Sequence, residues 1–181
     1  MIGSPCGGRP LFVAVDVHYL DDASARAAVV AAHDQRFSVI SYSDTAMVSV
    51  EAPYQPGAFY RRELPPLRAV IPMSVRLSLI VVDGYVNLDP EGRPGLGHQV
   101  HDEFGVPVIG VAKTAFQTAT HAAQVVRGRS TRPLYVTAAG MPIAEAAQIV
   151  GEMAGKFRLP AALKLADRLA RGLEIPASRG E

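Results

Sequence analysis

Cysteine is almost missing from this chain of 181 residues, in which Cys6 is the single example. One cysteine excludes an internal disulfide and suits a reducing compartment. Long hydrophobic runs are missing as well, so no membrane span is expected. The amino terminus has no basic segment followed by an apolar one, so we expect no secretion signal and a cytoplasmic location.

Familiar catalytic motifs are also absent. The sequence contains no cysteine cluster, no GxGxxG fingerprint, no GxxxxGK[ST] loop and no GxSxG elbow. Hydrophobic residues make up 49% of the chain and charged residues 19%, which is typical of a folded protein rather than a disordered one. We expect a flexible lead over residues 1–10, a single domain over 11–171 and a flexible tail over 172–181.

The net charge of +1 hides an uneven distribution. Residues 1–112 hold 8 basic and 12 acidic side chains, a net charge of −4, whereas residues 113–181 hold 10 basic and 5 acidic ones, a net charge of +5. An acidic half beside a basic half is compatible with a metal-binding cluster and a polyanionic partner. A solvated surface explains the same pattern, so charge alone does not identify a function.

The hydrophobic pattern predicts an α/β domain. Three early segments joined by short polar links suggest an antiparallel meander, and the later strands and helices alternate, so we expect a mixed sheet flanked by helices. Residues 24–33 fit a helix because of their alanines, and a strand because they are short and contain Val29 and Val30. The clearer strands are predicted at 11–19, 37–50, 77–82, 106–112 and 134–138, and helices at 58–70, 96–104, 142–155 and from Pro160 to about 171.

Two parts of the pattern are less regular. Pro65 and Pro66 fall inside the first predicted helix and predict a kink or an early end there. Residues 114–132 are polar, basic and poorly patterned, so no element is predicted in them.

Carboxylates at the ends of buried strands are the most informative feature. Asp83 ends the apolar run 77–82 and is followed by Gly84, and Asp16 ends a similar run near the start of the chain. Open α/β sheets bind ligands at the carboxyl ends of their strands. Glu63 lies on the predicted helix between the two strands. Oxygen ligands of this kind suit Mg²⁺ or Mn²⁺, which can activate water and neutralise charge on a phosphodiester.

Lys113 extends this cluster if the strand that precedes it runs parallel to the strand of Asp83, because an ammonium there would stabilise phosphoryl charge. Each residue alone has an ordinary explanation: an aspartate can cap a helix, and a glutamate or a lysine can simply be solvated. His98 and His101 have a spacing that suits zinc, but no third soft ligand lies nearby in the sequence.

Taken in order, several segments resemble the endonuclease V family, the metal-dependent deoxyinosine 3′-endonucleases with a ribonuclease H-like fold. Each segment is weakly specific alone, but together they span roughly residues 11–171. The matching stretches are Val15-Asp16-Val17-His18-Tyr19, Pro53-Tyr54-Gln55-Pro56-Gly57, Tyr60-Arg61-Arg62-Glu63-Leu64-Pro65, Val82-Asp83-Gly84, Gly95-Leu96-Gly97-His98, Val106-Pro107-Val108-Ile109-Gly110-Val111-Ala112-Lys113, Leu134-Tyr135-Val136-Thr137 and Phe157-Arg158-Leu159-Pro160 with Leu165-Ala166.

The resemblance implies a catalytic site and a strand for residues 24–33. It implies that Asp16, Glu63 and Asp83 hold Mg²⁺, with Mn²⁺ able to substitute, and that Lys113 lies near the scissile phosphate. These implied roles agree with what the strand-end pattern indicates.

The resemblance also implies residues that contact nucleic acid. Pro53, Tyr54 and Pro56 would form a wedge that separates the strands at the lesion, because a base must leave the stack before a pocket can read it. Gly84 would allow close approach of the backbone to the base, and His98 would belong to the same surface. Tyr54 also has a simpler explanation, as a loop aromatic that packs on the core.

Two positions depart from the family pattern. The chain has Asp89-Pro90 where the family usually has His-Pro, and Leu165-Ala166-Asp167 where it usually has Leu-Ala-His. Asp167 can still bind a metal directly or through water. Asp89 would repel a phosphate unless a metal or Arg93 compensates its charge. The chain is also shorter than usual between Lys113 and Leu134.

We therefore expect a monomeric Mg²⁺-dependent endonuclease that hydrolyses a phosphodiester 3′ to inosine in DNA or RNA. One alternative is a binding module for deaminated or single-stranded nucleic acid that cuts poorly or not at all. Another is a metal-dependent nuclease for a different nucleic-acid structure. Three converging carboxylates favour cutting, because they cost stability unless a metal holds them together.

Overall fold

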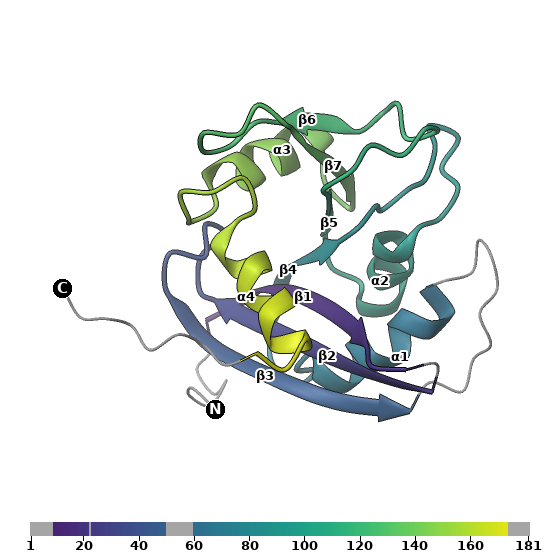
Figure 1. Ribbon diagram of the computed structural model, residues 1–181, viewed down its shortest axis with the longest axis vertical. Helices are drawn as coiled ribbons and strands as arrows, with labels where there is room; N and C mark the ends of the chain where they lie inside the picture. Colours follow the sequence, from purple (N-terminus) through teal and green to yellow (C-terminus); the bar gives the residue numbers. More distant parts are fainter. Residues whose placement is uncertain (1–8, 22, 50–59, 174–181) are drawn as a thin grey trace.

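A seven-stranded mixed sheet forms the centre of the protein (Figure 1). The computed structural model describes residues 9–21, 23–49 and 60–173. The strands are β1 (Leu11–Tyr19), β2 (Ser24–Ala32), β3 (Ile40–Ser49), β4 (Leu77–Asp83), β5 (Val108–Ala112), β6 (Ala123–Val125) and β7 (Leu134–Ala139), and the helices are α1 (Tyr60–Val70), α2 (Leu96–Phe104), α3 (Ile143–Glu152) and α4 (Ala161–Ala170). The sheet order is β3-β2-β1-β4-β5-β7-β6, which confirms the predicted mixed α/β sheet.

The first three strands form the predicted antiparallel meander. The ambiguous segment 24–33 is a strand, β2, which pairs with β1 on one side and β3 on the other. Its alanines and valines are buried, because α4 packs on one face of this part of the sheet and α1 on the other. Small side chains let both helices approach the strand closely, so burial decides the structure against the helical preference of alanine.

The centre of the sheet is parallel. β1 pairs with β4 so that Val15 lies opposite Val82, and β4 pairs with β5 so that Asp83 lies opposite Val111. The carboxyl ends of three neighbouring strands therefore meet at one edge. This register places Asp16 beside Asp83 and brings Lys113 to the same edge, as the sequence predicted for parallel strands.

Helices cover both faces of the sheet (Figure 1). On one face, α3 and α4 bury Ile149 and Leu163 against sheet residues that include Val81. On the other, α1 and α2 bury Leu67 and Val100 against a second apolar layer. The strand ends thus lie between two helical layers, where a polar side chain is shielded from water.

Two less regular parts of the pattern have different outcomes. Of the kink or early end predicted at Pro65 and Pro66, the early end does not occur, because helix α1 continues through both prolines to Val70, as predicted for residues 58–70. Each proline removes one backbone hydrogen bond, but the burial of Leu67 and Val70 in the second layer offsets that loss. The segment 114–132 does contain an element, since β6 pairs with β7 at the edge of the sheet.

Within residues 9–21, 23–49 and 60–173, no helix has the length and apolar character needed to cross a membrane. The predicted lead and tail fall mostly on residues 1–8 and 174–181, which lie outside the described part of the chain.

Candidate active site

Asp16 and Asp83 lie side by side where the parallel pairing of β1 and β4 ends: Asp83 is the last residue of β4, and Asp16 lies within β1, which continues to Tyr19. The parallel pairing of these strands reaches Val15 and Val82, so the two aspartates follow at adjacent positions. Both side chains are only partly exposed, and both line one small cavity. The amide of Val17 donates to Oδ1 of Asp16 over 2.9 Å, which fixes one oxygen of that carboxylate.

Glu63 reaches the same cavity from α1, a different element. It lies in the first turn of the helix, and the next turn is anchored by Leu67, which is 1% exposed. Glu63 is therefore directed toward the strand ends by helix packing. The three acidic residues singled out in the sequence meet at one place in the fold.

Burial and mutual repulsion act strongly on these carboxyls. Burial, then the charge of Asp83, raises the pKa of Asp16 to about 7, although the Val17 amide opposes the rise. Burial, then the charges of Asp16 and Asp83, raises the pKa of Glu63 to about 8. Three anions held this close oppose one another's ionisation, so the site favours a cation or protons.

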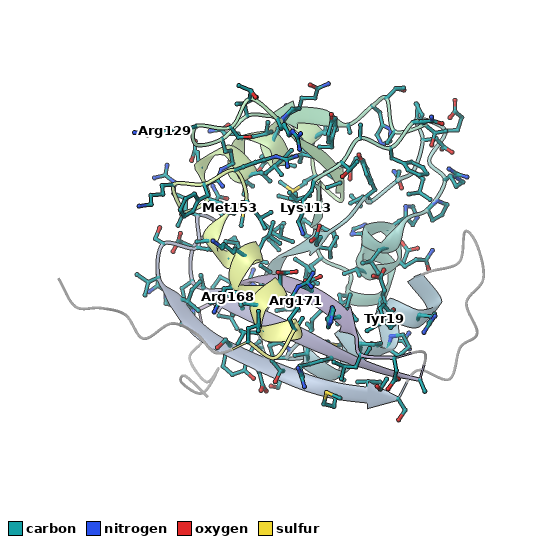
Figure 2. All side chains as sticks on the ribbon, in the orientation of Figure 1. Tyr19, Lys113, Arg129, Met153, Arg168 and Arg171 are labelled. Atoms are coloured by element: carbon teal, nitrogen blue, oxygen red, sulfur yellow. The ribbon has the colours of Figure 1, made fainter. Side chains whose placement is uncertain are left out.

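Lys113 supplies one positive charge to the cluster. Its ammonium lies 2.5 Å from Oδ2 of Asp83, and it follows β5 directly, at the strand end seen near the middle of Figure 2. Burial alone would lower the pKa of Lys113, but the hydrogen bond to Asp83 and the charges of Asp83, Asp16 and Asp167 raise it overall. The ammonium therefore stays charged at neutral pH.

Asp167 approaches from α4, on the face of the sheet opposite Glu63, and Arg171 directly follows that helix. Arg171 Nε donates to Oδ1 of Asp167 over 2.9 Å, one helical turn apart. Asp167 adds to the forces that raise the pKa of Asp16 and of Lys113. The carboxylate that replaces the family histidine thus belongs to the electrostatic surroundings of the site, and its charge is balanced by an arginine.

Asp89, the other departure, is also paired. Its Oδ2 lies 3.2 Å from Nε of Arg93, and its Oδ1 accepts the backbone N–H of Arg93 over 2.8 Å. Arg93 therefore compensates the charge of Asp89, which was one of the two possibilities, a metal or Arg93, that the sequence suggested.

The predicted nucleic-acid contacts have different outcomes. Gly84 has a φ of +144°, which side-chain-bearing residues rarely adopt, and a Cβ there would meet open space, so its position leaves the backbone approachable. His98 is held by Asn87, whose Oδ1 lies 2.9 Å from Nδ1 of the ring. Pro53, Tyr54 and Pro56 lie outside the described residues.

Sequence reasoning assigned no role to Arg158, although it lies in a matching segment. Its guanidinium donates to the backbone carbonyls of Lys113 and Pro133. It therefore fixes the backbone of the residue whose ammonium pairs with Asp83. The signal in the sequence was the arginine of Phe157-Arg158-Leu159-Pro160, but contact between main chain and side chain over 45 positions is not readable from a pattern.

The donor set fits a divalent cation. Asp16, Glu63 and Asp83 offer carboxylate oxygens only, which is the ligand type that Mg²⁺ and Mn²⁺ prefer. Among the described residues, no three His, Cys, Asp or Glu side chains are gathered at the spacing of metal ligands. Oδ2 of Asp83 contacts Lys113 instead. Ligation would therefore require side-chain rotation, and the mutual repulsion of the carboxylates favours a cation at this place.

One family model and several curated proteins match this sequence, and all have the same description. The family model described as Endonuclease V matches residues 9–168. The chain is 30% identical to Endonuclease V of Thermococcus kodakarensis over 166 residues, which cover 88% of this chain and 77% of that protein. It is 31% identical to Endonuclease V of Alkalilimnicola ehrlichii, with 96% of this chain and 86% of that protein covered.

Solved structures agree with the sequence matches. The crystal structure of Endonuclease V from Streptomyces avermitilis matches with a TM-score of 0.72 and 26% identity, covering 94% of this chain and 83% of that one. Ciona intestinalis Endonuclease V, solved with a 24mer DNA that contains an inosine followed by a ribo-adenosine, shares the fold with a TM-score of 0.72 at 18% identity, covering 90% and 85%. The expected ribonuclease H-like fold is confirmed, and the chain belongs to the endonuclease V family of nucleases.

Proposed function

We propose that this protein hydrolyses a phosphodiester bond 3′ to inosine in nucleic acid, with Mg²⁺ as its cofactor, and leaves 3′-hydroxyl and 5′-phosphate ends. The observation that carries the proposal is the meeting of Asp16, Asp83 and Glu63 around one cavity at the strand ends. The Ciona relative, which shares the fold and was solved with inosine-containing DNA, supports this choice of substrate.

In this proposal Asp16 and Asp83 hold the divalent cation and Glu63 completes its surroundings. Members of this family depend in general on divalent metals. A bound divalent cation would lower the pKa of a water molecule and neutralise charge on the phosphate. Mn²⁺, which prefers the same ligands, should replace Mg²⁺.

Lys113 and Gly84 have separate tasks in this proposal. The Lys113 ammonium lies 2.5 Å from Asp83 and so stands beside the phosphate that the acidic cluster would receive, where it stabilises developing negative charge. Arg158 keeps the backbone of Lys113 in place. Gly84, directly after Asp83, lets the extruded base approach the main chain.

Strand separation is assigned to Pro53, Tyr54 and Pro56, and His98 to the nucleic-acid surface, on the strength of the family resemblance. An aromatic ring between prolines suits a wedge, because it can fill the gap that an extruded base leaves. We further infer that residues 11–171 act as one monomeric domain in the cytoplasm. The first strand begins at Leu11 and the last helix ends at Ala170, which supports these bounds.

The weakly cleaving alternative rested on the loss of two family histidines, each replaced by a carboxylate. Asp89 is paired with Arg93 and Asp167 with Arg171, so neither presents an uncompensated charge to a phosphate. These pairs remove the electrostatic objection to cutting, and the meeting of Asp16, Glu63 and Asp83 supports cutting over binding alone.

The test uses end-labelled single strands with one inosine, made as DNA and as RNA, with Mg²⁺ or EDTA present. We expect one metal-dependent cut 3′ to the inosine, no cut in the matched strand that carries adenine, and no cut by the Asp83→Asn variant. Equal cutting with EDTA would refute the metal site, and equal cutting of both strands would refute the inosine preference.

A further inference from the structure

A basic cavity lies beside the acidic cluster. It measures about 960 Å³, which is large enough for a nucleotide. Arg129, Lys156 and Lys164 supply exposed cationic groups to its wall, and Figure 2 shows Arg129 reaching outward at the margin of the molecule. Among the residues that line the cavity, Asp167 is the one carboxylate. The excess of positive charge suits a polyanion.

An exposed aromatic ring forms part of the same wall. Phe157 is 57% exposed, although a phenyl ring of this size gains from burial. The ammonium of Lys164 lies 4.9 Å from the centre of the ring and that of Lys156 lies 5.6 Å from it. Both ammoniums lie over the ring, so a base that stacks on Phe157 would displace at least one of them. A lysine displaced in this way can pair with a neighbouring phosphate, and an exposed ring with such cations is a combination that binds single-stranded nucleic acid.

Hydrogen bonds from one buried arginine fix the backbone of the loop that carries Phe157. The buried guanidinium of Arg127 donates to five backbone carbonyls, all between positions 151 and 158. These acceptors are the carbonyl oxygens of Gly151, Met153, Gly155, Phe157 and Arg158. A side chain at Gly128 would strike the Lys156 carbonyl at 2.6 Å, so the two segments are in close contact. The ring is therefore presented on a fixed support.

Two residues connect the wall of the cavity with the catalytic edge. Asp167 lines it and also acts electrostatically on Asp16 and Lys113. Arg158, another lining residue, donates to the carbonyl of Lys113. A strand whose phosphate lies at Lys113 would therefore pass close to the cavity.

We propose that this cavity binds the nucleic-acid strand next to the cut, with one nucleobase stacked on Phe157 and neighbouring phosphates paired with Lys156, Lys164 and Arg129. The proposal rests on the proposed nuclease function and adds a strand-binding subsite to it. It requires no particular base, since every base presents a flat face to the ring.

The first experiment measures the affinity of fluorescent inosine-containing single strands by anisotropy, with Ca²⁺ in place of Mg²⁺ to prevent cutting. We expect Phe157→Ala to weaken binding roughly 5- to 150-fold, the range of one lost stacking contact, and Phe157→Tyr to retain the affinity. Met73→Ala is the matched control, because Met73 is 68% exposed and precedes β4, at the opposite end of that strand from Asp83. Its affinity should equal that of the wild type.

A series of strands with a single abasic position identifies the stacked base. At one position, removing the base should weaken binding to the wild type and leave binding to Phe157→Ala unchanged. If Phe157→Ala binds every strand as tightly as the wild type, or loses affinity equally for every member of the series, the stacking proposal is wrong.

Salt dependence tests the phosphate contacts. Replacing Lys156 and Lys164 together with alanine should reduce the slope of log affinity against log salt by about 1.4, since each phosphate contact to a single strand contributes about 0.7. The control Arg76→Ala, also exposed and preceding β4, should leave the slope unchanged. An unchanged slope in the lysine double variant would overturn this part of the assignment.

Two further results separate the subsite from the nuclease function and from another partner. If the wild type cuts inosine strands and Phe157→Ala binds and cuts identically, the subsite fails and the nuclease function stands. If no strand is cut but binding depends on Phe157, the subsite stands and the nuclease function fails. Tight Phe157-dependent binding of polyglutamate, with weak binding of DNA and RNA, would assign the cavity to an acidic protein segment and overturn the proposal.

Discussion

The ammonium of Lys113 lies 2.5 Å from Oδ2 of Asp83, and the pair joins the ends of two neighbouring parallel strands. Asp83 is also beside Asp16, so its charge is shared between an attractive and a repulsive neighbour. The lysine thus offsets part of the repulsion in the acidic cluster. The same charges therefore affect the cleavage rate, the stability of the fold at different pH values and the affinity for a metal.

Replacing either strand-end carboxylate should stop catalysis. We expect Asp16→Asn and Asp83→Asn to reduce metal-dependent cleavage by about 10²-fold or more, because each loses an anionic ligand. The fold should survive, which circular dichroism can verify. Wild-type rates in either variant would show that the two strand ends do not form the metal site.

The metal-free protein should become less stable as the pH rises. In the unfolded chain Asp16 and Glu63 ionise near 3.8 and 4.5, whereas in the folded protein their pKa values are about 7 and 8. Between these limits the folded state binds more protons, so raising the pH favours unfolding. The contribution of the two groups is complete below about pH 4 and is lost as the pH passes through 7 and 8.

Urea unfolding in EDTA measures this effect. The free energy of unfolding should be lower at pH 8 than at pH 5, and the double variant Asp16→Asn, Glu63→Gln should lose less stability over the same range. A wild type that is equally stable at both pH values, or a double variant with an undiminished fall, would contradict the assignment.

Divalent metal should stabilise the protein more at high pH than at low pH. At about a hundredfold excess over its dissociation constant, a metal that binds only the folded state adds roughly 2.7 kcal/mol. Protons on Asp16 and Glu63 compete with the metal, so the rise in Tm with Mn²⁺ should be larger at pH 8 than at pH 6. Asp83→Asn is the control. An identical rise in that variant would place the bound Mn²⁺ elsewhere.

Tyr54→Ala should impair recognition more than metal binding. A ring that stacks in the gap left by an extruded base contributes about 1–3 kcal/mol, so we expect weaker binding to inosine strands and poorer discrimination against adenine strands. The Mn²⁺-dependent change in Tm should remain. Unchanged affinity and unchanged discrimination would identify Tyr54 as a packing residue.

Asp89→His should not increase cleavage. Arg93 already balances Asp89, and the carboxylate also accepts the Arg93 backbone N–H, so the substitution removes a turn contact and frees a cation. We expect a small loss of stability, about 1 kcal/mol, from the lost hydrogen bond. A large gain in cleavage would show that the ion pair with Arg93 does not neutralise Asp89 in the presence of a phosphate.

The central part of the fold was predictable because buried strands are written in the sequence as short continuous apolar runs. The apolar runs that end at Asp16 and Asp83 belong to parallel strands, and the position of Lys113 follows from the parallel pairing of β5 with β4. β2 was ambiguous because its composition favours a helix, and only its two sheet neighbours and two covering helices decide the outcome. β6 was missed because three residues are too few to show periodicity.

Parts of the site could not be predicted for a different reason. The pairing of Asp89 with Arg93 is local and was foreseen as one possibility, but the contact of Arg158 with the Lys113 carbonyl joins distant segments. Every residue has a backbone carbonyl, so the amino-acid sequence does not show which carbonyl a distant side chain will contact. The same limit applies to the five acceptors of Arg127.

The contacts of Arg127 leave the loop that carries Phe157 free to change its side chains. Arg127 donates hydrogen bonds to backbone carbonyl oxygens, which every amino acid has. These bonds therefore do not depend on the side chains of the loop. Residues 156 and 157 can therefore be exchanged while the loop keeps its course. The course of the loop backbone is therefore independent of the side chains that would contact a strand. Under the proposed role of the loop, substitutions at these two positions can change strand preference without altering the acidic cluster.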